Sequence, residues 1–127
     1  NNWFLGGILR MAKILIVDDS RTSRKILRTI LESAGHEVVG EAVDGVDGVN
    51  KFRELSPEIT TLDITMPNMD GLEALKEIKK INANAKIIMV TAAGQQSKMV
   101  EAIKSGASEF VTKPFEADEI TGLIAKM

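Results

Sequence analysis

Short apolar runs alternate along the chain with longer segments in which apolar residues recur every three or four positions. The first pattern is typical of buried strands, and the second is typical of helices that pack on a sheet. The apolar runs predict five strands, at about residues 13–18, 37–42, 59–63, 86–90 and 109–112. Strands that alternate with helices favour βαβ units, and therefore a parallel sheet with right-handed crossovers.

Five helices are expected between and after these strands. Ser20 is a good N-cap for the first helix, the second covers about residues 47–55, and Asp70 can cap the third. The fourth covers about residues 95–105, and the last follows Pro114. The apolar residues expected to face the sheet are, helix by helix, Ile26, Leu27, Ile30 and Leu31; Val49 and Phe52; Leu72, Leu75 and Ile78; Val100 and Ile103; and Ile120, Leu123 and Ile124. This order of elements predicts an α/β fold with a doubly wound, five-stranded parallel sheet.

Composition restricts the class of protein. The 127 residues suit one domain, and 44% hydrophobic with 27% charged residues is ordinary for a globular chain. A net charge of −2 without a basic run argues against nucleic-acid binding. No apolar stretch approaches the ~20 residues that a membrane span needs. There is no cysteine, and the single histidine, His36, cannot form a zinc site alone.

The first ten residues differ from the rest of the chain. Residues 1–10 lack the basic start of a signal peptide and end directly before Met11, which reads like a natural start. We expect residues 1–10 to be a leader that was added to the chain or produced by upstream translation, or a disordered segment. A short apolar arm that packs on this domain or on a neighbour is the alternative. Residues 11–127 are then expected to form the folded domain.

Polar residues follow the predicted strands at the point where each strand ends. Asp18 and Asp19 close the first apolar run, and Asp63 ends the third. Because the carboxyl ends of parallel strands share one edge of a sheet, these three acids should lie close together. They would repel one another without a hard cation, and Mg²⁺ takes carboxylate and phosphate oxygens as ligands. Thr91 and Lys113 end two further strands and add a hydroxyl and a positive charge to the same edge.

An acidic pair, a lone Asp, a hydroxyl and a Lys-Pro dipeptide, each ending a different strand, resemble the receiver domain of two-component response regulators. The resemblance covers about residues 11–127 and implies the strand order 2-1-3-4-5. It also implies a cytoplasmic signalling switch, and not a metabolic enzyme. In such a switch a sensor histidine kinase supplies the phosphoryl group from a phosphohistidine. The switch catalyses its own phosphorylation and its slow dephosphorylation.

The same resemblance assigns the chemistry to particular residues. Asp63 is the expected phosphoacceptor, and it needs no histidine base because a carboxylate is already ionised near neutral pH. Mg²⁺ is the expected cofactor, bound by Asp19, Asp63 and the backbone carbonyl of Thr65. Asp18 is expected to contact the ion indirectly, through a metal-bound water.

The resemblance also implies phosphoryl contacts and a conformational switch. Lys113 would supply a cation to a phosphoryl oxygen, with a cis peptide bond between it and Pro114. Thr91 would donate its hydroxyl to the phosphoryl group, and Phe110 would fill the space that Thr91 vacates. Phe110 lacks the hydroxyl that many relatives carry there, and a static aromatic is the alternative interpretation. Met99 is expected to share an apolar docking patch with Phe110.

These features favour a chemotaxis-type regulator that docks on the flagellar motor switch. The segment Gly94-Gln95-Gln96 resembles some chemotaxis receivers. The expected partners are a sensor histidine kinase, this downstream protein and a phosphatase, and we expect a monomer. A single-domain phosphorelay intermediate is the alternative.

Two other protein classes fit the sequence poorly. A haloacid-dehalogenase-type phosphatase also uses an Asp nucleophile with Mg²⁺, but it requires Asp-x-Asp, and Ser20 stands where the second Asp should be. A flavodoxin-like FMN carrier should have a phosphate loop rich in Ser, Thr and Gly after its first strand. The acidic pair at that position would repel phosphate.

Overall fold

The computed structural model describes residues 11–127, so the predicted leader lies outside the described residues. Within this range five strands alternate with five helices. They are β1 (Lys13–Val17), α1 (Arg21–Ser33), β2 (Glu37–Ala42), α2 (Gly45–Leu55), β3 (Ile59–Asp63), α3 (Gly71–Ile81), β4 (Lys86–Thr91), α4 (Gln96–Lys104), β5 (Glu109–Thr112) and α5 (Ala117–Lys126). None of the helices in this range has the length and apolar character to cross a membrane.

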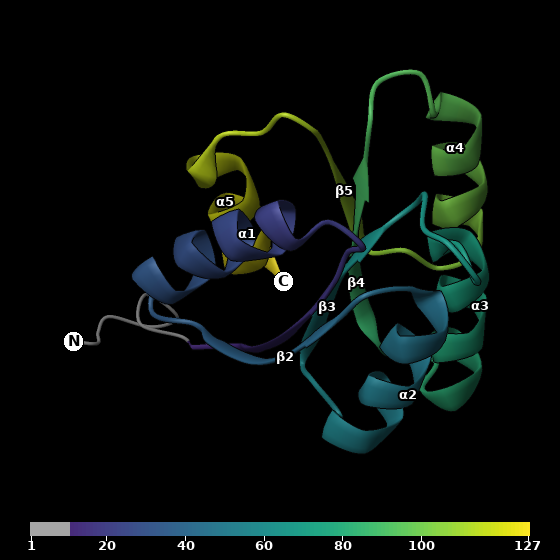
Figure 1. The fold of residues 1–127 in the computed structure, drawn as a ribbon, viewed down its shortest axis with the longest axis horizontal. Helices are drawn as coiled ribbons and strands as arrows, with labels where there is room; N and C mark the ends of the chain where they lie inside the picture. Colours follow the sequence, from purple (N-terminus) through teal and green to yellow (C-terminus); the bar gives the residue numbers. More distant parts are fainter. Residues whose placement is uncertain (1–10) are drawn as a thin grey trace.

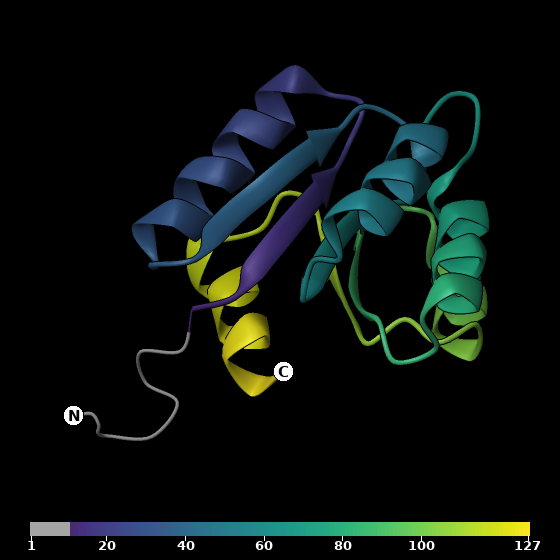
Figure 2. The same cartoon turned by 90° about the horizontal axis from the view of Figure 1, so that it is seen from below.

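The strands form one parallel sheet in the order β2-β1-β3-β4-β5, as predicted (Figure 1). Helices α1 and α5 cover one face, and α2, α3 and α4 cover the other, which Figure 2 shows from a perpendicular direction. Each face has its own buried apolar cluster. β2 and β3 lie on opposite sides of β1, so the direction in which strands are added to the sheet reverses at β1. Ligands in such sheets bind at the carboxyl ends of the strands beside this reversal.

The helix starts follow the expected capping chemistry. The side chains of Ser20 and Asp70 each accept a hydrogen bond from the backbone N–H three residues later, at 3.2 and 2.9 Å. The second helix begins earlier than predicted, at Gly45, because Asp44 caps the backbone N–H of Asp47 at 2.8 Å. An Asp that caps its helix satisfies N–H groups that have no partner within the helix.

For two helices, some of the residues predicted to face the sheet are exposed instead. Ile26 in α1 is 54% exposed, and Val100 and Ile103 in α4 are 55% and 50% exposed. The α4 residues in the core are instead Met99 and Ala102. Each of these precedes a β-branched apolar residue, so two adjacent faces of α4 are apolar and periodicity cannot separate them. Of the other predicted core residues, Ile30, Leu72 and Leu123 are partly buried and the rest are buried.

A close backbone contact joins the start of α3 to the end of β3. The N–H of Gly71 donates to the carbonyl oxygen of Ile64 at 2.7 Å. A Cβ atom on Gly71 would lie 2.0 Å from the carbonyl oxygen of Asp63. Only glycine therefore lets α3 begin directly behind Asp63.

We expect Gly71→Ala to lower the free energy of unfolding by about 2–3 kcal/mol, because the new methyl group would overlap backbone atoms that have little room to move. The matched control is Gly122→Ala in α5, where an added Cβ meets nothing within 4 Å. This control should raise the free energy of unfolding by up to about 1 kcal/mol, since Ala is the better helix former. Urea denaturation of both variants measures the difference, and equal effects would contradict the packing argument.

Candidate functional site at the carboxyl edge of the sheet

The structure brings the three predicted acids together. Asp18 and Asp19 follow β1 and Asp63 ends β3, and one carboxylate oxygen from each lies within 4.8 Å of the others. Their exposure differs: Asp18 is buried, Asp63 is largely buried and Asp19 is exposed. The cluster therefore has a fixed inner part and one side chain that faces solvent.

Lys113 places one positive charge in this cluster. Its Nζ lies 3.0 Å from Oδ2 of Asp18 and 3.4 Å from Oδ1 of Asp63. Burial opposes protonation of Lys113, but the hydrogen bond with Asp18 and the charges of both carboxylates outweigh it and raise the pKa of Lys113. Its backbone N–H donates to the carbonyl of Thr91 at 2.7 Å, which anchors this residue beside β4. The peptide bond between Lys113 and Pro114 is cis, as predicted.

The negative charge in the cluster is only partly balanced. Burial, and next the negative charge of Asp18, raise the pKa of Asp63 from 3.8 to about 6, although Lys113 acts in the opposite direction. Asp63 is therefore still mainly ionised at pH 7, but it loses its proton at a higher pH than an ordinary carboxyl group does. Oxygen ligands with excess negative charge are what a hard divalent cation such as Mg²⁺ prefers, so the residues present fit such an ion.

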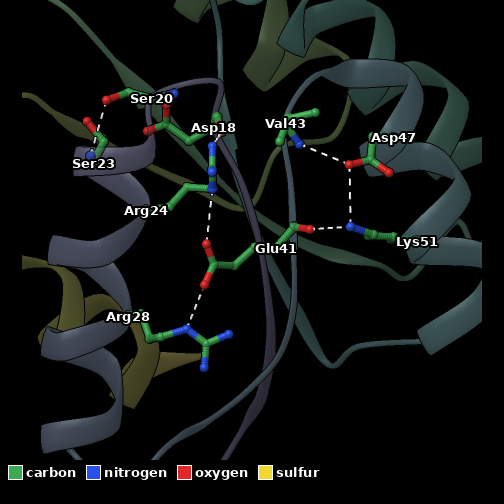
Figure 3. Close-up of polar contacts among 9 residues, drawn as sticks. All are labelled: Asp18, Ser20, Ser23, Arg24, Arg28, Glu41, Val43, Asp47 and Lys51. Atoms are coloured by element: carbon green, nitrogen blue, oxygen red, sulfur yellow. Dashed lines mark hydrogen bonds and ion pairs between the residues drawn. The ribbon is translucent and has the colours of Figure 1, made fainter.

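Asp18 is held by contacts at both its backbone and its side chain (Figure 3). Its Oδ1 accepts from the backbone N–H of Ser20 at 2.8 Å, and Nη1 of Arg24 donates to its carbonyl oxygen at 2.8 Å. Arg24 also pairs with Glu41 on β2 at 3.0 Å, and Arg28 pairs with the same carboxylate at 2.6 Å. These contacts of Asp18 were not predicted from the sequence. The only sign of them there is that the first helix carries Arg24 and Arg28 while the second strand carries the oppositely charged Glu41.

Thr91 lies at the end of β4, as predicted, and is buried. Its hydroxyl donates to Oε1 of Gln95 at 3.0 Å and lies 3.2 Å from the carbonyl oxygen of Ala92. Nε2 of Gln95 donates to the hydroxyl of Thr65. Sequence analysis gave Gln95 no role at the site, although it identified both residues that Gln95 joins.

An apolar groove of about 270 Å³ runs between α4 and β5 beside Thr91. Met99 and Phe110 both line it, together with Val100 and Ile103. Phe110 is 44% exposed, whereas Met99 is 9% exposed. The two α4 residues that were wrongly predicted to be buried therefore form an exposed wall of this groove.

A second groove, of about 380 Å³, lies beside Lys113 on the other side of the site. Ile26, Pro114 and Phe115 contribute apolar surface to it, and Asp18 and Lys113 lie at its polar end. The exposure of Ile26 is thus explained by its place on the wall of this groove. A bulky group could approach the acidic cluster from this side.

The chain belongs to the response regulator receiver domain family, whose family model matches residues 14–125. It is 49% identical over 115 residues to the chemotaxis protein CheY of Thermotoga maritima, covering 91% of this chain and 96% of that protein. It is 52% identical over 114 residues to CheY of Bacillus subtilis, covering 90% and 95%. These matches confirm the predicted family and support the chemotaxis assignment over the other protein classes considered.

Solved structures agree with the sequence matches. The structure of a CheX–CheY complex with beryllofluoride and magnesium from Borrelia burgdorferi aligns with a TM-score of 0.86 and 34% identity. The alignment covers 90% of this chain and 87% of that chain. The receiver fold predicted from the sequence is therefore confirmed.

The charge crowding predicts a pH-dependent gain in stability for Asp63→Asn. Because folding raises this pKa from 3.8 to about 6, ionised Asp63 destabilises the folded state above about pH 6, and the effect disappears as the pH falls toward 4. In metal-free buffer at pH 7.5 we expect the variant to be more stable than the wild type by up to about 3 kcal/mol. Urea denaturation across this pH range measures the difference.

The control for this experiment is Glu37→Gln, which removes an exposed carboxylate at the amino end of β2, at the opposite edge of the sheet from the cluster. Its stability relative to the wild type should change little between pH 4 and 7.5. An Asp63→Asn variant that is less stable than the wild type at pH 7.5 would contradict the account of charge crowding.

Proposed function

We propose that the protein is a phosphorylation-driven switch in which Asp63 accepts a phosphoryl group from a phosphohistidine of a sensor histidine kinase. A carboxylate oxygen of Asp63 forms a bond to phosphorus while the P–N bond breaks, and the electron pair goes to the imidazole nitrogen. The observation that carries this proposal is the meeting of Asp18, Asp19 and Asp63 with Lys113 at one sheet edge.

Catalysis in this proposal is mainly electrostatic. An anionic carboxylate has to approach an anionic phosphoryl group, so nearby cations must lower the repulsion. Lys113 supplies an ammonium group 3.4 Å from Oδ1 of Asp63. Mg²⁺ would be held by Asp19, Asp63 and the backbone carbonyl of Thr65, with Asp18 acting through a water. When bound, this ion would neutralise charge on the carboxylate and phosphoryl oxygens.

The output of the switch is proposed to pass through Thr91 and Phe110. A phosphoryl group adds about −1.5 to −2 charges, which is sufficient to reorganise a segment that offers it a hydrogen bond. Thr91 would donate its hydroxyl to that group, and Phe110 would then move toward the vacated space. This movement would reshape the groove between α4 and β5, whose apolar residues include Met99.

The partners follow from the relatives of the chain. A downstream protein such as the flagellar motor switch would bind the surface formed by α4, β5 and α5. The Borrelia CheY described in complex with CheX supports a further partner, and we propose a phosphatase in that role. Self-catalysed phosphorylation, slow dephosphorylation and a cytoplasmic location stay predictions.

Incubation with acetyl phosphate and Mg²⁺ tests the reaction directly. Intact mass measurement, with quenched early time points, should show one phosphoryl adduct on the wild type. The adduct should be absent from Asp63→Asn and from a sample that contains a chelator, because both lack part of the proposed site. The same fraction of phosphorylated protein in Asp63→Asn as in the wild type would contradict the assignment of the phosphoacceptor.

The proposed output surface predicts that phosphorylation is sensed at Met99. Beryllofluoride imitates a phosphoryl group, so its addition with Mg²⁺ should shift the methyl NMR signal of Met99. The methyl signal of Met11, which is exposed at the opposite end of β1 from Asp18, is the control and should not move. If the signals of Thr91 and Lys113 shift on addition of beryllofluoride and the Met99 signal does not, Met99 is not part of the output surface.

A further inference from the structure

Gln95 lies directly before α4, but its side chain does not cap this helix. Ser, Thr, Asp and Asn are preferred at such positions because their short side chains reach the free N–H groups of the first turn. The longer side chain of Gln95 instead turns back to Thr91, Ala92 and Thr65. We call these three hydrogen bonds the Gln95 bridge.

The contacts define which way the amide of Gln95 points. The backbone N–H of Ala92 can only donate, so the atom that lies 3.0 Å from it must be the carbonyl oxygen Oε1. This oxygen carries no hydrogen, and therefore the hydroxyl of Thr91, also at 3.0 Å, must donate to it. Nε2 is then free to donate to the hydroxyl of Thr65. All three bonds agree with a single orientation.

The Gln95 bridge leaves Thr91 with no proton to give to another group. A threonine hydroxyl has one hydrogen, and the acceptors recorded for Thr91 are Oε1 of Gln95 and the carbonyl oxygen of Ala92. The proposed function requires this same proton for a phosphoryl oxygen on Asp63. Phosphorylation and the Gln95 bridge therefore compete for Thr91.

We propose that Gln95 is a positioning residue that stabilises the unphosphorylated state by holding the hydroxyl of Thr91, and that phosphorylation must open the Gln95 bridge. This inference rests on the proposed function and deepens it. A state that has to be left before a ligand binds lowers the apparent affinity for that ligand. Removal of the Gln95 bridge should therefore make the site more receptive.

The position of Gln95 also connects the site to the proposed output surface. Thr65 follows Asp63 by two residues, so the Gln95 bridge joins the segment after β3 to the segment before α4. Gln95 also lines the groove that contains Met99 and Phe110. Opening of the Gln95 bridge would thus release the start of α4 at the moment when Thr91 turns to the phosphoryl group.

Gln95→Met tests the inference, because methionine has a similar length but cannot form these hydrogen bonds. With Mg²⁺ present, we expect the apparent affinity for beryllofluoride to rise about fivefold, as expected for the loss of a small set of competing hydrogen bonds. In the protein without beryllofluoride, the Thr91 methyl NMR signal should move toward its position in the beryllofluoride-bound wild type. Ser97→Met, at an exposed position in the first turn of α4 that does not line the groove, is the matched control and should change neither measurement.

Kinetics separate this role from direct contact with the phosphoryl group. The Gln95 bridge is already open in the phosphorylated state, so Gln95→Met should speed phosphorylation by acetyl phosphate and leave the rate of dephosphorylation unchanged. A changed dephosphorylation rate with unchanged beryllofluoride affinity would overturn the inference and place Gln95 against the phosphoryl group instead. Gln95→Ala repeats the measurements if thermal denaturation shows that the methionine variant is unfolded.

The outcomes distinguish this inference from the proposed function. If the wild type binds beryllofluoride, Asp63→Asn does not, and Gln95→Met matches the wild type, then only the inference about Gln95 fails. If the wild type itself shows no binding that depends on Asp63, then the proposed function fails and the inference fails with it.

Discussion

The fold forces three carboxylates to share one small region with a single ammonium group. The backbone of β1 and β3 holds Asp18 and Asp63 beside each other, because both strands are central in the sheet and buried, and Asp19 follows Asp18 directly. Lys113 reaches two of these carboxylates and reduces the repulsion without removing it, so that the pKa of Asp63 stays at about 6. The remaining excess of negative charge makes the site suited to a divalent cation and to a phosphoryl group that arrives with it.

The surrounding structure maintains this arrangement at some loss of stability. Arg24 and Glu41 secure the backbone of Asp18 from α1 and β2, and Gly71 allows α3 to start directly behind Asp63. Neither contact involves a group that would react. They hold Asp18 and Asp63 in place before any ligand binds, and such preorganisation is what electrostatic catalysis requires.

The site residues could be predicted from the sequence where a single local pattern indicates a single structural position. A charged residue directly after a buried apolar run locates a strand end, and the parallel order of the strands then brings such ends together, as it does for Asp63 and Lys113. The sequence prediction was wrong for α4, where Met99-Val100 and Ala102-Ile103 present two equivalent apolar faces and only the packed sheet decides between them. The contacts of Gln95 could not be predicted either, because they depend on the conformation of two segments outside the regular elements.

A divalent cation should relieve the charge crowding at Asp63. A ¹³C NMR titration of the Asp63 carboxyl group, with and without Mg²⁺, measures this relief. We expect a pKa near 6 without metal and a clear fall when Mg²⁺ is added, since a bound cation favours the ionised form. A pKa near 4 in both samples would contradict this expectation, because the site would then have neither the predicted repulsion nor the predicted affinity for the ion.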